Sequence, residues 1–244
     1  MNRYFLVLIL FFLISCNSSE ERSEAQQIID KAIEKAGGEK YANADIEFTF
    51  RKTKYTSSRK GGKYEFTRNI TDTTGKTYYD ILNNDGFTRY HEDEKIEISD
   101  SLAGVYSESV NAVHYFVQLP FGLNDPAVEK ELVGEDTINN KNYYEIRVTF
   151  KQEGGGKDHE DEYMYWIGKE DYTIDYLAYR FFVNDGGIRF RKAVNPRVVE
   201  GIRFVDYENY KTDDLSVKLE ELDEMFQKGE LPKVSEISNE ILEV

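Results

Sequence analysis

The sequence predicts a mostly β fold of the α+β class, built on an antiparallel sheet with helices packed against it. Three observations support this prediction. Apolar residues alternate with polar ones along most of the chain, short turns rich in Gly and Asn separate these segments, and the 18 Tyr and 15 Phe favour strands. Strands do not alternate with long helices, which excludes parallel α/β barrels and Rossmann folds.

The first fifteen residues predict a secretory signal. Arg3 supplies a positive charge, an unbroken apolar run covers residues 4–14, and the small residue Ser15 precedes Cys16. This run is too short to span a bilayer, which needs about 20 apolar residues. Leu13-Ile14-Ser15-Cys16 resembles a bacterial lipoprotein box, which implies cleavage before Cys16 and lipidation of its sulfur. The alternative is an ordinary signal peptide with a chance cysteine.

The rest of the chain divides into a tether and one domain. Residues 16–23 are expected to form a short polar tether that carries the lipid, and residues 24–244 a single domain large enough to bury a core. Asn17 after the cysteine resembles an outer-membrane sorting signal. We therefore expect a protein anchored to the outer membrane by its N-terminal lipid, on the periplasmic or the cell-surface side.

Charge and motif content exclude several functions. A formal net charge of −15 disfavours nucleic acid, whose binding depends on Lys and Arg. Cys16 is the only cysteine, so its lipidation leaves no disulfide, thiol nucleophile or cysteine metal site. No Gly-x-Ser-x-Gly, His-Glu-x-x-His or glycine-rich nucleotide motif is present. The sequence therefore predicts no cofactor and assigns no catalytic residue.

Three segments show helical periodicity. Residues 23–36 carry an apolar stripe and are followed by two glycines, residues 101–117 repeat apolar residues every three or four positions, and residues 215–228 do the same. Asp100 or Ser101 is the expected cap of the second helix. The tail, residues 231–244, fits neither period clearly.

The remaining segments predict a meander of antiparallel strands. We expect strands at residues 45–51, 64–67, 77–82, 87–91, 95–98, 142–151, 163–167, 173–184, 187–194 and 198–210. Gly61-Gly62, Thr74-Gly75 and Asn84-Asp85-Gly86 mark turns among the earlier strands, and Asn195-Pro196 marks the last turn.

This order of elements resembles the superfamily of LolA- and LolB-type lipoprotein carriers. The features that carry the resemblance are the lipoprotein signal, a helix ending in Ala36-Gly37-Gly38, the strand at residues 46–50, the meander, and the turn at residues 165–174. The resemblance implies a curved, incomplete β-barrel covered by helices, with an apolar cavity that takes acyl chains. The carrier itself is not lipidated, so Cys16 fits a receptor-like member better, and the helix at residues 215–228 has no clear counterpart.

The apolar strand faces are the main candidate site. Eight aromatic residues are predicted to line a cavity for an apolar, acyl-type ligand: Phe48, Phe50, Phe66, Tyr144, Trp166, Phe181, Phe190 and Phe204. The alternative is that they form a filled core beneath the helices.

A second candidate is the apolar segment at residues 115–123. It either plugs the core or forms a hydrophobic lip in which Phe116, Leu119 and Phe121 are exposed to a partner.

Charged residues give weaker indications. Four arginines of the second half of the meander could receive an anionic headgroup or pair with acids on an outer face: Arg180, Arg189, Arg191 and Arg203. The sequence His-Glu-Asp-Glu occurs at residues 91–94 and 159–162, but neither copy has the spacing of a known calcium loop. His114 is expected on a helix far from both copies. We therefore predict no metal site.

Three functions remain open. The first is a lipid-anchored module that binds an acyl chain or similar molecule in the half-barrel. The second is a structural or interaction lipoprotein with a filled core that contacts an envelope protein of unknown identity. The third, less favoured, is a surface hydrolase acting through carboxylates, which would require two acids facing each other across a cleft.

Overall fold

Sheet A contains the N-terminal strands and the last strand of the chain. The computed structural model describes residues 22–153, 160–183 and 185–244, so Cys16 and the predicted signal lie outside the described residues. The strands of this sheet, in spatial order, are β14 (Asn239–Glu243), β1 (Asp45–Phe50), β2 (Thr53–Lys60), β3 (Lys63–Thr71), β4 (Thr77–Asn83), β5 (Gly86–His91) and β6 (Glu94–Lys95).

Sheet B contains the second half of the meander and is also antiparallel. Its strands, in spatial order, are β13 (Lys233–Ile237), β12 (Ile202–Thr212), β11 (Gly187–Val199), β10 (Ile174–Phe181), β9 (Glu162–Gly168), β8 (Lys141–Phe150) and β7 (Val128–Ile138). The four consecutive antiparallel strands predicted between residues 163 and 210 are present as β9 to β12.

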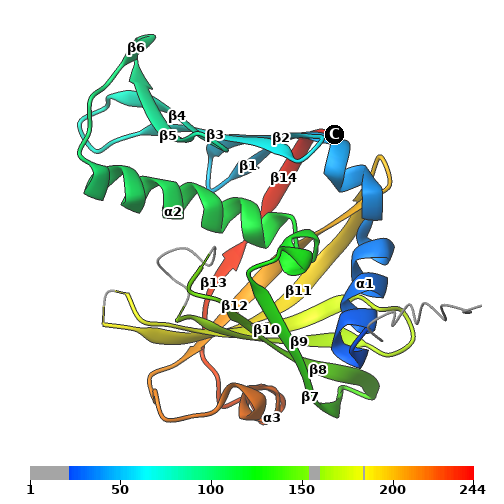
Figure 1. Cartoon of the computed structure of the whole chain (residues 1–244). Coiled ribbons are helices and arrows are strands. Elements are labelled where there is room, and N and C mark those ends of the chain that lie inside the picture. The colour runs from blue at the N-terminus through cyan, green and yellow to red at the C-terminus, as the bar shows by residue number, and fades with distance from the viewer. Residues whose placement is uncertain (1–21, 154–159, 184) are drawn as a thin grey trace, which may run out of the picture.

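The C-terminal segment joins the two sheets. Strand β13 pairs with β12 of sheet B, and strand β14, one residue later, pairs with β1 of sheet A. In Figure 1 this segment, coloured red, passes from the lower layer to the upper one. The two sheets are not closed into a barrel, since β6 and β7 each have a single strand neighbour in the described residues. The predicted mostly β fold of the α+β class is therefore confirmed.

Helices lie between the two sheets and along one side. Helix α1 (Glu24–Ala36) is capped by Ser23, whose hydroxyl accepts a hydrogen bond from the Gln26 N–H at 3.2 Å. Helix α2 (Asp100–Val117) lies under sheet A, and the 3₁₀ helix η2 (Phe121–Asn124) follows it (Figure 1). The cap of α2 is Ser99, whereas the sequence predicted Asp100 or Ser101. The 3₁₀ helix η1 (Gly38–Asn43) connects α1 to β1.

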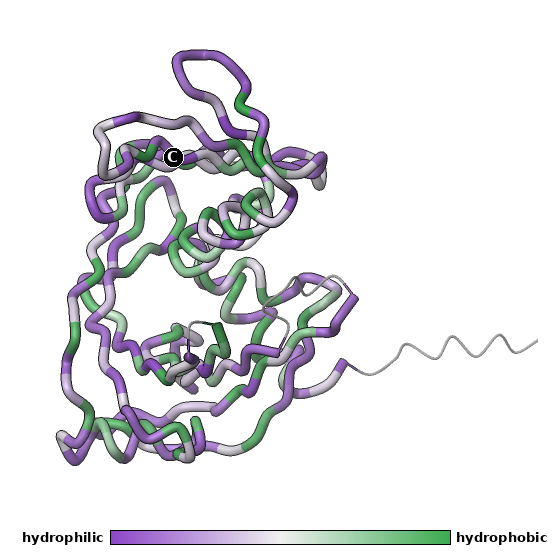
Figure 2. Tube along the Cα trace, turned by 90° about the vertical axis from the view of Figure 1, so that its left-hand side faces the viewer, coloured by the Kyte–Doolittle hydropathy of each residue, from purple (hydrophilic) through white to green (hydrophobic). Residues whose placement is uncertain are grey.

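Apolar residues fill most of the space between the sheets. The main core packs α1 and the segment after α2 onto the inner face of sheet B, and a smaller core lies between η1, β1 and the start of β12. Figure 2 shows the two layers with a helix between them and hydrophilic residues at the outlying turns. Within the described residues, no helix combines the length and apolar character needed to cross a membrane.

The last turn of the meander is not where the sequence places it. Residues Asn195 and Pro196 form a bulge inside β11, where the register with β12 shifts between Val194 and Arg197. The chain turns instead at Glu200-Gly201, where both residues have positive φ, at 47° and 84°. Proline lacks an N–H, so a bulge accommodates it within a strand.

The predicted helix at residues 215–228 is much shorter. The 3₁₀ helix η3 (Leu219–Glu221) leads into α3 (Leu222–Gln227), while the side chain of Asp214 holds residues 214–216 in a turn by accepting hydrogen bonds from Ser216. The prediction places Leu215, Leu219, Leu222 and Phe226 on one apolar face. Leu219 and Leu222 are buried against the outer face of sheet B and Phe226 packs beside them, but Leu215 is 46% exposed. The ambiguous tail forms β13 and β14.

Candidate ligand groove

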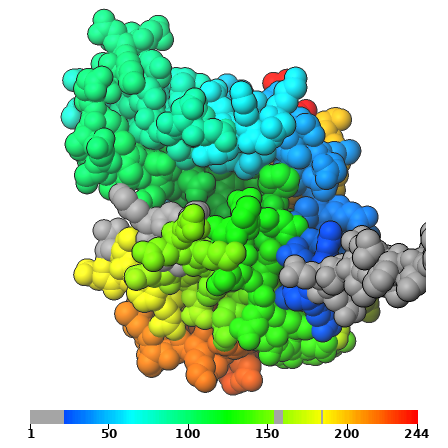
Figure 3. Space-filling view, in the orientation of Figure 1, coloured from blue at the N-terminus to red at the C-terminus, as the bar shows by residue number. Residues whose placement is uncertain are grey.

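A groove of about 720 Å³ lies between the inner face of sheet A, helix α2 and η2. It is lined by Ala42, Arg59, Gly62, Lys63, Tyr64, Phe66, Leu82, Asn84, Gly104, Ser107, Glu108, Asn111, Phe121 and Asp125. In the space-filling view the surface is hollowed between the cyan strands of sheet A and the green segment that follows α2 (Figure 3). Its volume lies within the range of about 300–1,000 Å³ that is usual for small-molecule sites.

A smaller recess of about 150 Å³ continues the groove towards sheet B. Four residues line both cavities: Arg59, Phe66, Asn111 and Asp125. The recess adds apolar and aromatic groups from α2, β7 and β8, among them Tyr115, Val128 and Phe150. A ligand that enters the groove can therefore extend an apolar part into the recess.

Arg59 of β2 lies where the groove meets the recess. Its guanidinium carbon is 4.8 Å from the centre of the Phe66 ring and 4.9 Å from that of Phe121. Its Nε and Nη2 both donate to the Gln118 side-chain oxygen at 3.3 Å. No carboxylate of the described residues forms an ion pair with it. Burial lowers the pKa of Arg59, which the nearby Asp125 carboxylate partly opposes, but a guanidinium stays protonated in proteins, so the groove contains a cation that has no carboxylate in ion-pair contact among the described residues.

His114 of α2 lies deeper, behind Arg59. Its ring stacks on Phe66 with 4.2 Å between centroids and meets the edges of Phe48 and Tyr55. Desolvation lowers the pKa of His114 to about 3, so the ring is neutral at physiological pH. Its Nδ1 is 3.3 Å from the Gln118 amide nitrogen. The positive charge of the site is therefore carried by Arg59 and the exposed Lys63, and not by the histidine.

The eight predicted cavity residues do not form one surface. Phe66 lines both the groove and the recess, and Phe48 packs behind it, stacked on Tyr55. Phe204 is buried in the smaller core with η1, and Phe50, Tyr144 and Phe181 are half-buried at separate places. Trp166 and Phe190 lie on the outer face of sheet B beneath α3, so they cannot contact a ligand in the groove.

The segment at residues 115–123 plugs the core and does not form a lip. Leu119 and Leu123 are buried against sheet B, and Phe116 packs on Tyr179 with 5.4 Å between ring centroids. Phe121 is half-buried and lines the groove beside Arg59. Burial of these apolar side chains is more favourable in free energy than their exposure to water as a lip would be, because helix α1 and sheet B provide apolar surface for them to contact.

The four predicted arginines are engaged elsewhere. Arg180 donates to the backbone carbonyls of Leu215 and Val217, and Arg203 is paired with Asp175 at 3.7 Å. Arg189 packs over Phe181 at 5.2 Å. Arg191 is buried, stacks on Phe116 at 3.9 Å and donates to the Tyr179 hydroxyl.

The sequence analysis did not identify Arg59 as a candidate site residue. Tyr55, Ser57 and Arg59 alternate on the inner face of β2, and this pattern is not apolar.

The His-Glu-Asp-Glu sequences form no ligand set among the described residues. His91 is half-buried, and its Nδ1 lies 2.9 Å from the Thr77 carbonyl oxygen. The second copy begins at His159, which is outside the described residues. His114 lies on a helix, as predicted. Three other carboxylates, Asp136, Glu145 and Asp223, do converge, on the outer face of sheet B.

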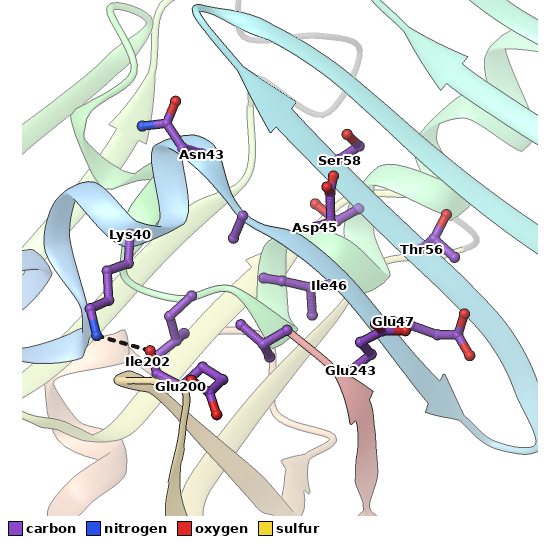
Figure 4. A pocket seen from close by; sticks show the side chains of 13 residues that line it. Lys40, Asn43, Asp45, Ile46, Glu47, Thr56, Ser58, Glu200, Ile202 and Glu243 are labelled. Carbon is purple, nitrogen blue, oxygen red and sulfur yellow. Dashed lines mark hydrogen bonds between the residues drawn. The ribbon is translucent and has the colours of Figure 1, made fainter.

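A second recess, of about 690 Å³, lies where η1, β1, β2, β14 and the β11–β12 turn meet. Its walls carry four acids, Asp45, Glu47, Glu200 and Glu243, and one lysine, Lys40, whose Nζ donates to the Glu200 carbonyl at 2.9 Å (Figure 4). This excess of negative charge disfavours an anionic ligand, so the groove at Arg59 is the better candidate for one.

Comparison with solved structures finds matches at low identity. The LolA superfamily protein NE2245 of Nitrosomonas europaea is 11% identical, with 90% of this chain and 94% of that chain covered and a TM-score of 0.48. A DUF1329 family protein of Desulfovibrio piger is 12% identical, with coverages of 85% and 99% and a TM-score of 0.47. An outer-membrane lipoprotein-sorting protein domain of Vibrio parahaemolyticus, described as putative in its structure report, is 8% identical, with coverages of 83% and 97% and a TM-score of 0.45.

These matches include chains described as LolA-superfamily and lipoprotein-sorting proteins, the group that the sequence resembles. No curated protein matches the chain. A family described as "Family of unknown function (DUF6503)" matches residues 2–239, which is nearly the whole sequence. The chain therefore belongs to this family.

Proposed function

We propose that this protein is a lipid-anchored envelope lipoprotein that binds an acyl-type molecule with one negative charge in the groove between sheet A and α2. The observation that carries the proposal is Arg59, a half-buried cation that faces the groove and lacks a carboxylate partner among the described residues. A guanidinium can hold a carboxylate through two parallel hydrogen bonds. Such a ligand would supply the close ion pair that Arg59 lacks among the described residues.

The walls of the groove support an amphiphile over a small polar anion. Phe66, Phe121, Leu82 and Tyr64 contribute apolar and aromatic surface around the guanidinium, and the recess extends this surface towards sheet B. Asp125 lies on the same wall, and the chain as a whole is strongly acidic. These negative charges disfavour a ligand with several charges, so one carboxylate on an alkyl chain fits best.

The lipid anchor is supported by the sequence alone, through residues 13–16. Replacement of Cys16 by Ala should remove the attachment site and shift the protein from the membrane fraction to the soluble fraction after carbonate extraction. Ser15, beside it, offers a control, because Ser15→Ala keeps a small residue before the cysteine. Sedimentation of the Cys16→Ala variant with membranes would contradict the anchor.

An interaction lipoprotein is the alternative, and exposed apolar residues favour it. Leu102 and Val105 on the first turns of α2 are 46% and 53% exposed, and Phe182 and Val183 after β10 are 56% and 50% exposed. Such residues can contact an envelope protein. A hydrolase is less supported, because the three carboxylates that converge in the described residues lie on the outer face of sheet B and not across the groove.

Native mass spectrometry of residues 17–244, before and after extraction with organic solvent, tests the binding proposal. We expect a bound mass in the range of a fatty acid or another singly charged lipid, lost on extraction and regained with added dodecanoate. Asn111→Phe, which places a ring in both cavities, should abolish the uptake. Ala112→Phe, on the exposed side of the same helix turn, should leave it unchanged. A protein that binds neither a native molecule nor dodecanoate would favour the interaction lipoprotein.

A further inference from the structure

Three carboxylates from distant parts of the sequence converge on the outer face of sheet B, away from the groove. Asp136 comes from β7, Glu145 from β8 and Asp223 from the first turn of α3. One oxygen of each lies within 4.8 Å of the others. Glu145 and Asp223 are buried, and Asp136 is half-buried.

No cation of the described residues compensates these acids. None of the three forms an ion pair with a lysine, arginine or histidine in the described part of the chain. Arg147, two residues after Glu145 on β8, pairs with Glu131 at 3.2 Å and Glu162 at 3.1 Å and also contacts Glu220. The convergent acids are therefore not part of an internal salt-bridge network.

Asp223 provides the second observation that points to a ligand. Asp223 is 0% exposed, and neither of its carboxylate oxygens has a partner with good hydrogen-bond geometry among the described residues, although the Asp136 side chain and the Glu224 N–H lie nearby. Glu145, in contrast, accepts one hydrogen bond from the Trp166 indole N–H at 3.1 Å. A buried carboxylate without donors is strongly unfavourable, and such groups in proteins are paired or coordinate a metal ion.

The backbone opposite Glu145 leaves room for its carboxylate. Gly134 faces Glu145 at the bulge of β7, and a Cβ at this position would lie 2.7 Å from Glu145 Oε2. Any other residue would therefore displace the carboxylate from its place beside Asp136 and Asp223. The absence of a side chain at Gly134 therefore leaves the space that the Glu145 carboxylate occupies in the cluster.

We propose that Asp136, Glu145 and Asp223 bind a calcium ion. All three ligands are oxygens, which hard divalent cations prefer over the nitrogen and sulfur ligands typical of zinc. Oxygens separated by up to 4.8 Å accommodate calcium–oxygen distances of about 2.3–2.6 Å in an irregular geometry. Asp136 is half-buried, so water can complete the coordination from its side.

The ion would fasten α3 to sheet B. Helix α3 has only six residues, which is too short to be stable alone, and it contributes Leu222 to the outer core beside Trp166. Asp223 follows Leu222 directly. Calcium binding should therefore stabilise the C-terminal segment against local opening without altering the groove.

Terbium luminescence of the full-length chain tests the proposal, because Trp166 is the only tryptophan and hydrogen-bonds to a proposed ligand. Excitation of the indole should produce terbium emission that calcium reverses. Asp223→Asn should weaken terbium and calcium binding at least tenfold. The paired variant Glu92→Gln/Asp93→Asn, in the exposed β5–β6 turn, should leave binding unchanged. Calcium should also raise the melting temperature of the wild type and not that of Asp223→Asn.

Two outcomes would overturn the site. One is the absence of sensitised emission from the wild type, which would mean that the acids share a proton and not a cation. The other is equal binding by the wild type and the Asp223→Asn variant, which would place the ion elsewhere. If Asp223→Asn does not fold by circular dichroism, Asp136→Asn at the half-buried position replaces it, with the same expected loss of binding.

Discussion

The two sheets contain buried carboxylates in opposite surroundings. In sheet A, Asp80 is 0% exposed and lies between two arginines: Arg68 donates from Nη2 at 2.6 Å and Arg89 from Nε at 2.7 Å. On sheet B, Asp223 is equally buried, but its neighbours are two more acids. The first group is compensated by the protein itself, whereas the second requires a proton or an external cation.

The contrast separates buried charge that maintains the fold from buried charge that points to a ligand. The Asp80 cluster is closed further by Tyr78 and Tyr106, whose rings lie against the Arg89 guanidinium at 4.8 Å and 3.7 Å. Arg59 resembles Asp223 with the sign reversed, because it has aromatic neighbours and no opposite charge in ion-pair contact. We therefore assign ligands to Arg59 and Asp223, and a structural role to Asp80.

The largest expected effect follows from removal of the compensated carboxylate. Asp80→Asn leaves Arg68 and Arg89 buried without their counter-ion, so the free energy of unfolding in urea should fall by about 3–5 kcal/mol. Calcium should not restore it. Asp72→Asn, in the exposed β3–β4 turn, is the matched control and should cost far less. A loss below about 1 kcal/mol for Asp80→Asn would contradict the structural role.

A smaller effect is expected in the pH dependence of stability. Burial and the neighbouring Asp136 raise the pKa of Asp223 from 3.8 to about 7. Between these values the folded state keeps a proton that the unfolded state has lost. The contribution of this proton to the free energy of unfolding is therefore fully present below pH 3.8. It decreases by up to about 1.4 kcal/mol per pH unit as the pH rises, and it is lost once the pH has passed through 7.

The effect of Asp223 on stability can be separated from that of other titrating groups by comparing the wild type with Asp223→Asn. In the presence of a chelator, wild-type stability should decline from pH 4.5 to 7.5 relative to Asp223→Asn, which has no titrating group at this position. Saturating calcium should remove most of that decline. If the two proteins show parallel pH profiles in urea titrations with chelator, Asp223 does not titrate as the structure indicates.

Much of the fold could be predicted from the sequence, because its signals are local. Helical spacing located α2 to within one residue, and turn signals that contain glycine, such as Gly61-Gly62 and Thr74-Gly75, located the early turns. The bulge at Pro196 was not predictable, because proline is equally compatible with a turn. Strand alternation could not show that Trp166 and Phe190 face outward, since sheet B is covered by apolar groups on both faces.

The sites were less predictable because their residues meet only in three dimensions. Arg59 lies on a polar strand, and its significance depends on Phe121 and Gln118, about 60 residues away. Asp136 and Asp223 are far apart in the sequence, with strands β8 to β12 between them. They meet in space because α3 folds back onto the outer face of sheet B. In so acidic a chain, no local pattern distinguishes these acids from solvated ones.

The most direct test of the proposed function is a titration calorimetry comparison of dodecanoate and dodecan-1-ol, each binding to residues 17–244 below its aggregation concentration. The acid should bind at least tenfold more tightly than the alcohol, about 1.4 kcal/mol, and Arg59→Gln should remove this preference. Lys60→Gln, the exposed neighbour on β2, should preserve it. Equal affinities of the wild type for both compounds, or a preference that survives in Arg59→Gln, would contradict the role of Arg59 in ligand recognition.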